Sequence, residues 1–175
     1  MRFVTLVAAV FIMLVSPVWV GAPDYIPEDV KAGRAAKQRG DYDLALELFS
    51  RAIKLQPDYA LAYNERGQVY HRKHLYGKAI ADYTRAIELQ PTGSGHFYHR
   101  GNVYFVMRNY PQAIIDYSQA IKLQPDYSRF YGARCVAYER SGEVDLAVKD
   151  CRHALKLNPN NSYAQRALRR MGGAP

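Results

Sequence analysis

The phrase YTRAIELQP, residues 83–91, has three near-copies in this chain. FSRAIKLQP ends at Pro57, YSQAIKLQP ends at Pro125 and CRHALKLNP ends at Pro159, so that successive prolines stand 34 residues apart. A unit of this length cannot bury its apolar face alone and does so by stacking on its neighbours. The phrase therefore predicts an array of repeated units rather than one closed core.

Each unit is predicted to hold two helices. Apolar residues recur every three or four positions within rows of 34 residues that begin at residues 26, 60, 94 and 128, which is helical spacing. Breaks at Gly40-Asp41, Asn109 and Gly142-Glu143 divide the rows, and the recurring proline stops the second helix. Small residues form the columns Gly33, Gly67, Gly101, Cys135; Ala45, Ala79, Ala113, Ala147; and Ala52, Ala86, Ala120, Ala154, and bulky residues form Tyr63, Phe97, Tyr131; Tyr70, Tyr104, Tyr138; and Phe49, Tyr83, Tyr117, Cys151.

This pattern resembles the tetratricopeptide repeat, with copies at residues 26–59, 60–93, 94–127 and 128–161. The glycines, the alanine and aromatic columns and the terminal prolines carry the resemblance. It implies an all-α superhelix, an α-solenoid of helix-turn-helix repeats whose concave face is lined by the first helix of each repeat. It also implies that the chain binds a protein or peptide and is not an enzyme.

Residues 162–175 are expected to form a capping helix and tail that cover the last repeat. Ser162 is placed to cap the start of this helix, and Gly172 to terminate it. The apolar stripe of the helix consists of Tyr163, Ala164, Ala167, Leu168 and Met171.

Residues 1–22 have the pattern of an export signal. A positive start at Arg2 precedes an apolar run from Phe3 to Val15, and Val20-Gly21-Ala22 offers small residues for cleavage. Pro23 would follow the cut, which disfavours cleavage, and residues 3–22 are just long enough to span a bilayer. Two alternatives remain open: a cleaved signal peptide on a protein exported to a bacterial periplasm, or an uncleaved membrane anchor with the chain facing outward.

The charge of the chain does not indicate nucleic-acid binding. The formal net charge is +8, but the basic residues are scattered through the repeats and no run of five like charges occurs. The sequence also has no Gly-x-Ser-x-Gly motif, and both cysteines stand in packing columns. We therefore expect no catalytic residues and no cofactor.

Polar residues that the scaffold does not require are expected on the concave face. Amides there could pair with the backbone of an extended peptide, and arginines with carboxylates, so we expect an acidic or neutral partner segment. The alternative is that these are merely tolerated solvent positions. Val30 and Arg34 stand where some relatives use a lysine and an asparagine to grip a C-terminal carboxylate, so that pattern is absent. The predicted groove residues are Arg34, Asn64, Gln68, Arg72, Tyr98, Asn102 and Arg129.

The two cysteines replace a matched pair of packing residues. Cys135 stands in the glycine column of the first helices, and Cys151 in the aromatic column of the second helices. The two lie nearly opposite each other across the turn near Gly142, so in an oxidising compartment we predict a disulfide between them. The alternative is two small buried thiols.

Four histidines suggest the rival function, a metal-binding protein or metal-dependent enzyme using His71 and His99. His71 and His74 are three residues apart, as are His96 and His99. No acidic or thiol ligand accompanies them, and His74 is expected in a turn. We therefore do not predict a metal site.

Overall fold

The computed structural model describes residues 27–172, so the predicted export signal or anchor at residues 1–22 lies outside the described residues. The described residues form nine helices and no strand, which confirms the all-α prediction. No helix among them is long and apolar enough to cross a membrane. The helices are α1 Glu28–Gln38, α2 Tyr42–Leu55, α3 Ala60–Arg72, α4 Tyr76–Leu89, α5 Ser94–Val106, α6 Tyr110–Leu123, α7 Ser128–Ser141, α8 Val144–Leu157 and α9 Ser162–Arg170.

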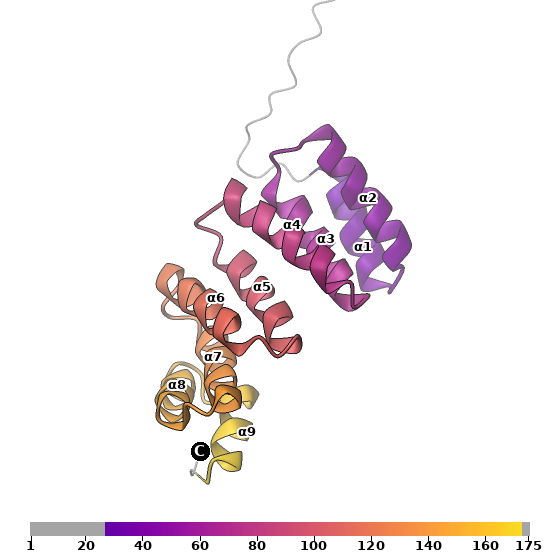
Figure 1. Ribbon diagram of the computed structural model, residues 1–175. Coiled ribbons are helices and arrows are strands. Elements are labelled where there is room, and N and C mark those ends of the chain that lie inside the picture. The colour runs from indigo at the N-terminus through magenta and orange to yellow at the C-terminus, as the bar shows by residue number, and fades with distance from the viewer. Residues whose placement is uncertain (1–26, 173–175) are drawn as a thin grey trace, which may run out of the picture.

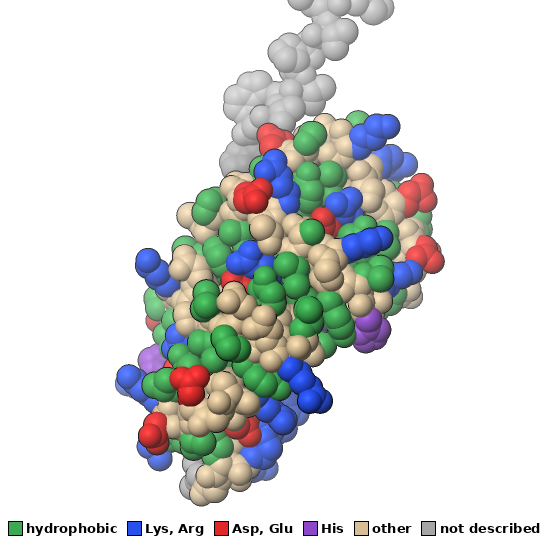
Figure 2. All heavy atoms as spheres, viewed as in Figure 1, with side chains coloured by type: hydrophobic (Ala, Val, Ile, Leu, Met, Phe, Trp, Pro, Cys, Tyr) green, Lys and Arg blue, Asp and Glu red, His purple; other side chains and the backbone are tan. Residues whose placement is uncertain are grey.

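The helices stack as one array that advances from α1 to α9 (Figure 1). Each first helix packs on its own second helix, and each second helix packs on the first helix of the next repeat. The first helices α1, α3, α5 and α7 also contact one another in order. Helix α9 packs on α7 and α8 and covers the end of the array, as predicted for a cap. On the face drawn in Figure 2, basic and acidic side chains are interspersed with apolar ones.

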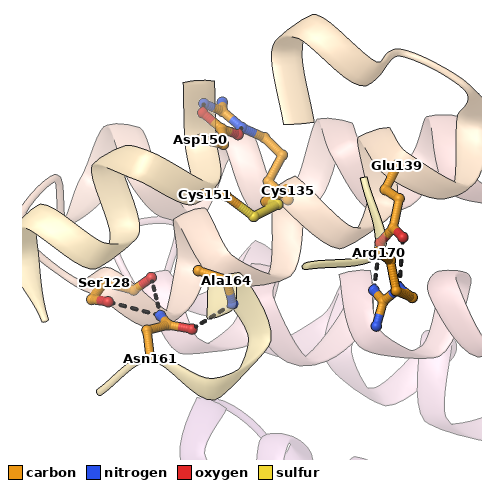
Figure 3. The surroundings of a disulfide bond; sticks show 9 residues. Ser128, Cys135, Glu139, Asp150, Cys151, Asn161, Ala164 and Arg170 are labelled. Carbon is orange, nitrogen blue, oxygen red and sulfur yellow. Dashed lines mark hydrogen bonds and ion pairs between the residues drawn. A yellow bond between two sulfur atoms is a disulfide. The ribbon is translucent and has the colours of Figure 1, made fainter. Parts of the chain in front are cut away.

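Side-chain caps begin three of the helices. Asp41 accepts a hydrogen bond from the Leu44 backbone N–H at 3.2 Å, and Asn109 one from Gln112 at 3.3 Å. The prediction that Ser162 caps α9 is wrong, because Asn161 caps it and Ser162 is the first helical residue. Asn161 takes this role because its amide nitrogen also donates to the carbonyl and hydroxyl oxygens of Ser128, so the cap is anchored to α7 (Figure 3).

The glycine column exists because an aromatic ring lies directly over each glycine. A Cβ atom added at Gly67 would lie 2.9 Å from the Tyr83 ring, and one at Gly101 would lie 2.8 Å from the Tyr117 ring. In the fourth repeat the Cys135–Cys151 disulfide occupies this place, with a Cα–Cα distance of 5.4 Å (Figure 3). Both cysteines are 0% exposed. The disulfide thus takes the place of the glycine–aromatic contact between the two helices of a repeat.

An arginine column that the sequence analysis did not single out connects successive repeats. The Arg66 guanidinium of α3 donates two hydrogen bonds of 2.8 Å to Asp82 on α4, and a third of 3.1 Å to Ser50 on α2. It also lies over the rings of Tyr63 and Tyr70, so two bulky columns flank it. We call this arrangement the arginine clamp. It ties the second helices of two adjacent repeats to one guanidinium.

The arginine clamp recurs in the next two repeats. Arg100 donates to Asp116 at 2.8 and 2.9 Å and to Thr84 at 3.0 Å. Arg134 donates to Asp150 at 2.6 and 2.9 Å and to Ser118 at 2.9 Å. Ala32 and Leu48 stand at the corresponding positions of the first repeat, so α1 and α2 have no such clamp.

The turn inside each repeat has a left-handed residue at the same position. The φ angles are +80° at Gly40, +59° at His74, +61° at Arg108 and +88° at Gly142. A residue with a Cβ atom is strained in this region, whereas glycine is not. The second and third turns therefore carry a strain that the first and fourth avoid.

Replacing the strained arginine should stabilise the protein. We expect Arg108→Gly to raise the unfolding free energy by about 0.5–1 kcal/mol, because the relief of strain exceeds the added entropy of the unfolded chain. The melting temperature should rise accordingly. Met107→Gly is the matched control, since Met107 has φ −75° and should lose stability on the same change. Equal destabilisation by both substitutions would contradict this account of the turn.

The disulfide should leave no titratable thiol in the unfolded, unreduced chain, and its reduction should lower the unfolding free energy by about 3 kcal/mol. A paired variant tests the replacement directly. Cys135→Gly with Cys151→Phe recreates the Gly33–Phe49 contact of the first repeat and should melt above the reduced wild-type chain. Two reactive thiols in unreduced protein would disprove the bond.

Candidate binding groove

Three hollows follow one another along the first helices. The first, of about 290 Å³, is lined by Lys37, Gln38, Gly40, Tyr42, Gln68 and Arg72. The second, of about 610 Å³, shares Gln68 and Arg72 with the first and adds His71 and His99. The third, of about 320 Å³, shares His71 and Val106 with the second. Because neighbouring hollows share walls, they form one continuous groove, and we call them the N-terminal, central and apolar hollows.

The apolar hollow draws its walls from five helices, with His71 from α3 and Tyr117 from α6. Tyr98, Asn102, Phe105 and Val106 come from α5, and Ala133 and Val136 come from α7. Tyr163 comes from α9, and it is 46% exposed. The sequence predicts that Tyr163 lies in the apolar stripe that covers the fourth repeat. The structure instead places it at the end of the groove.

A single buried acid pairs with two cations at the first end of the groove. Glu65 is only 6% exposed and accepts from Arg34 Nε at 2.7 Å and from Lys37 Nζ at 2.5 Å. The Lys37 ammonium also donates to the Gln68 amide oxygen at 2.8 Å. Two of the predicted groove residues, Arg34 and Gln68, are therefore already used inside the molecule. Glu65 is not one of the groove residues that the sequence predicts.

Arg72 is placed differently from these residues. It is exposed, lies between the N-terminal and central hollows, and pairs with no carboxylate in the described part of the chain. No Asp or Glu side chain lines any of the three hollows. The lining therefore holds Arg72, a guanidinium without a carboxylate partner, besides Lys37, which shares Glu65 with Arg34.

Some predicted groove residues also make contacts inside the repeat array. Tyr117 donates its hydroxyl proton to the Asn102 amide oxygen at 2.8 Å, and the Tyr98 ring packs 5.2 Å from the Phe130 ring and 5.9 Å from the Tyr117 ring. Asn64 is 7% exposed. Tyr98 and Asn102 therefore make contacts inside the array, although the sequence predicts that the scaffold does not require them.

Four of the seven predicted groove residues line the hollows. They are Gln68, Arg72, Tyr98 and Asn102. Arg34, Asn64 and Arg129 do not line any of the three, and the exposed Arg129 lies over the ring of Tyr127. Sequence spacing thus predicts the helices that line the hollows, but not which of their side chains stay exposed.

The histidines do not converge on one point. His74 Nδ1 lies 2.9 Å from the Tyr76 hydroxyl, and His96 Nε2 lies 3.2 Å from the Gln90 amide oxygen. The His99 ring stacks on Tyr83, with centroids 5.8 Å apart. Among residues 27–172 no group of three or more His, Cys, Asp or Glu side chains could hold a metal ion.

Burial lowers the pKa of two groove histidines, His71 and His99. Desolvation lowers the pKa of His99 to about 4, with Glu65 acting in the opposite direction. Desolvation, reinforced by the charge of Arg72, also lowers the pKa of His71. Arg72 is the arginine among the residues that line the central hollow.

Family models described as tetratricopeptide repeat match residues 30–94, 97–127 and 128–161. The chain belongs to the tetratricopeptide repeat family. Members of this family are generally non-enzymatic repeat scaffolds. No curated protein sequence matches the chain.

Solved tetratricopeptide structures are similar in fold. The crystal structure of MamA has a TM-score of 0.72 and 22% identity, over 85% of this chain and 86% of MamA, and it shows the fold alone. The first TPR of Spaghetti (RPAP3), bound to the HSP90 peptide SRMEEVD, has a TM-score of 0.63 and 29% identity over 65% of this chain and 90% of its own. The Arabidopsis OM64 TPR domain has a TM-score of 0.62 and 27% identity, over 64% of this chain and 93% of its own.

The buried neutral His99 should make stability depend on pH. The unfolded histidine titrates near 6.5 and the folded one near 4, so its contribution is complete above pH 6.5 and is lost as the pH falls toward 4. The loss should be at most about 1.4 kcal/mol per pH unit. Urea unfolding measured near pH 7 and near pH 5 gives the loss of unfolding free energy between the two pH values. This loss should be smaller in His99→Gln than in wild type. An identical loss in both proteins would contradict the assignment.

Proposed function

We propose that this protein is a non-enzymatic scaffold that holds a segment of a partner protein in its groove, outside the cytoplasm. The observation that carries the proposal is the continuous groove along α1, α3, α5, α7 and α9. It combines an uncompensated arginine with exposed apolar side chains, and no carboxylate lines it. An acidic or neutral segment, extended or helical, is complementary to such a surface.

A similar protein supports peptide binding as the activity. The first TPR of Spaghetti (RPAP3) was solved with an HSP90 peptide bound, SRMEEVD, in which three residues are acidic. Val30 and Arg34 differ from the lysine and asparagine that grip a terminal carboxylate in some relatives, and Arg34 is paired with Glu65. We therefore propose an internal segment as the ligand rather than a chain terminus.

Two features support a location outside the cytoplasm. Residues 1–22 have the sequence pattern of an export signal. A disulfide buried between α7 and α8 is typical of an oxidising compartment. A bacterial periplasm is the proposed compartment, where the scaffold would support assembly of an envelope complex. The protein would be either released there or tethered by residues 3–22.

Site-specific photo-crosslinking tests the proposal in cells that make the chain with its own N-terminal segment. A benzophenone amino acid is placed at Val106, between the central and apolar hollows, or at Ile115, which is 58% exposed on α6 and lines none of the hollows. We expect a discrete adduct in the envelope fraction from position 106 and none from position 115. Adducts only from position 115, or adducts only with cytoplasmic proteins, would contradict it.

A further inference from the structure

The apolar hollow leaves large apolar side chains open to solvent. Val106 is 48% exposed and Tyr163 is 46% exposed, and Phe105 and Val136 are half-buried beside them. Apolar side chains that converge on one concave site mark a place for a ligand, whereas scattered single ones do not. At about 320 Å³ the apolar hollow suits one large apolar side chain.

The apolar hollow also has a polar edge. The Asn102 amide oxygen accepts the Tyr117 hydroxyl proton at 2.8 Å, so both groups are held in place. Tyr98 and Tyr163 bring further hydroxyl groups to the same hollow. This edge can hydrogen-bond the backbone of a segment whose side chain enters the hollow.

A buried hydroxyl without a partner lies in the wall of the central hollow. Tyr83 is 0% exposed, and its hydroxyl has no hydrogen-bond partner among the described residues. The equivalent Tyr117 is satisfied by Asn102, but the residue equivalent to Asn102 is Gln68, and its amide oxygen accepts from Lys37 instead. Leaving a buried hydroxyl unpaired costs free energy, which a polar ligand group in this hollow could recover.

The central hollow also fixes the sign of the ligand charge. Glu65 pairs with both Arg34 and Lys37, so one net positive charge remains in that group, and Arg72 adds a second that no carboxylate pairs. A guanidinium pairs best with a carboxylate, which can accept two parallel hydrogen bonds. Since the central and apolar hollows share His71 and Val106, two ligand groups would lie side by side along the groove.

We propose that the groove recognises a two-part motif in an extended partner segment: a large apolar side chain in the apolar hollow and a nearby carboxylate on Arg72. Helix α9 then serves the ligand as well as the fold, because Tyr163 completes the apolar hollow. This inference rests on the proposed function and specifies its ligand.

Selection from a phage-displayed library of random linear peptides on the immobilised full chain tests the motif. Selected peptides should pair Asp or Glu with a large apolar residue at a fixed short spacing. Selection on Arg72→Glu should exchange the acidic residue for Lys or Arg and keep the apolar one. This reversal would not follow if Arg72 were only a solvated surface residue.

Binding of a labelled selected peptide, measured by fluorescence anisotropy, tests each hollow separately. Val106→Asp and Tyr163→Ala should each weaken binding by roughly tenfold or more. Arg72→Glu should do the same and reduce the salt dependence. The matched controls Ile115→Asp and Arg152→Ala lie on exposed outer positions of α6 and α8 and should leave affinity unchanged. Melting curves identify any variant that loses binding by unfolding.

The outcomes separate the motif from the proposed function. A set of selected peptides that shares no such motif, and still binds the Val106→Asp variant more weakly than the wild-type chain, would overturn the motif. That result would leave groove binding in place. If neither Val106→Asp nor Arg72→Glu changes the affinity for the peptide, both the motif and the proposed groove binding are overturned. If the full chain self-associates and Val106→Asp abolishes this association, a second copy of the chain occupies the groove. That result would also overturn the motif.

Discussion

The arginine clamp is the interaction on which the shape of this molecule depends. Arg66, Arg100 and Arg134 each bind an aspartate of their own repeat and a hydroxyl of the preceding one. A planar guanidinium with three fixed partners sets both the distance and the angle between two helices. Because each guanidinium is mostly buried beside at least one aromatic ring, solvent screens these pairs less than surface ion pairs. The same contact recurs at each of the three junctions between repeats, so it repeats one helix arrangement along the array.

The first and last repeats are held together by other interactions. The first repeat has Ala32 and Leu48 in place of the clamp residues, and an exposed Asp29–Arg51 pair joins α1 to α2. The last repeat carries the disulfide, and Asn161 ties α9 to the start of α7. The Asn161 side chain fits there because Gly132 has no Cβ, which would lie 2.7 Å from the amide oxygen. The groove thus has a covalently fixed end beside the apolar hollow and a less constrained end at α1.

The sequence was enough to predict the helices, the stacking and the cysteine pair, because each depends on local spacing or on a column of the repeat. The arginine clamp had the same kind of signal, since Asp82, Asp116 and Asp150 stand 34 residues apart as their arginines do. Repeat spacing did not predict which groove side chains remain unpaired and available to bind a partner. Whether Arg34 is free depends on Glu65, which is 31 residues distant. The place of Tyr163 depends on the docking of α9, which repeat spacing does not determine. Of the seven predicted groove residues, Arg72 remains the exposed and unpaired one in the hollows.

The central claim is that an array held at a fixed angle by the arginine clamps binds its partner through the first helices and α9. Amide hydrogen exchange of the full chain, with and without a saturating selected peptide, tests this most directly. The account predicts added protection in α3, α5, α7 and α9, with little change in the outer helices α4, α6 and α8. Added protection confined to α4, α6 and α8 would contradict it.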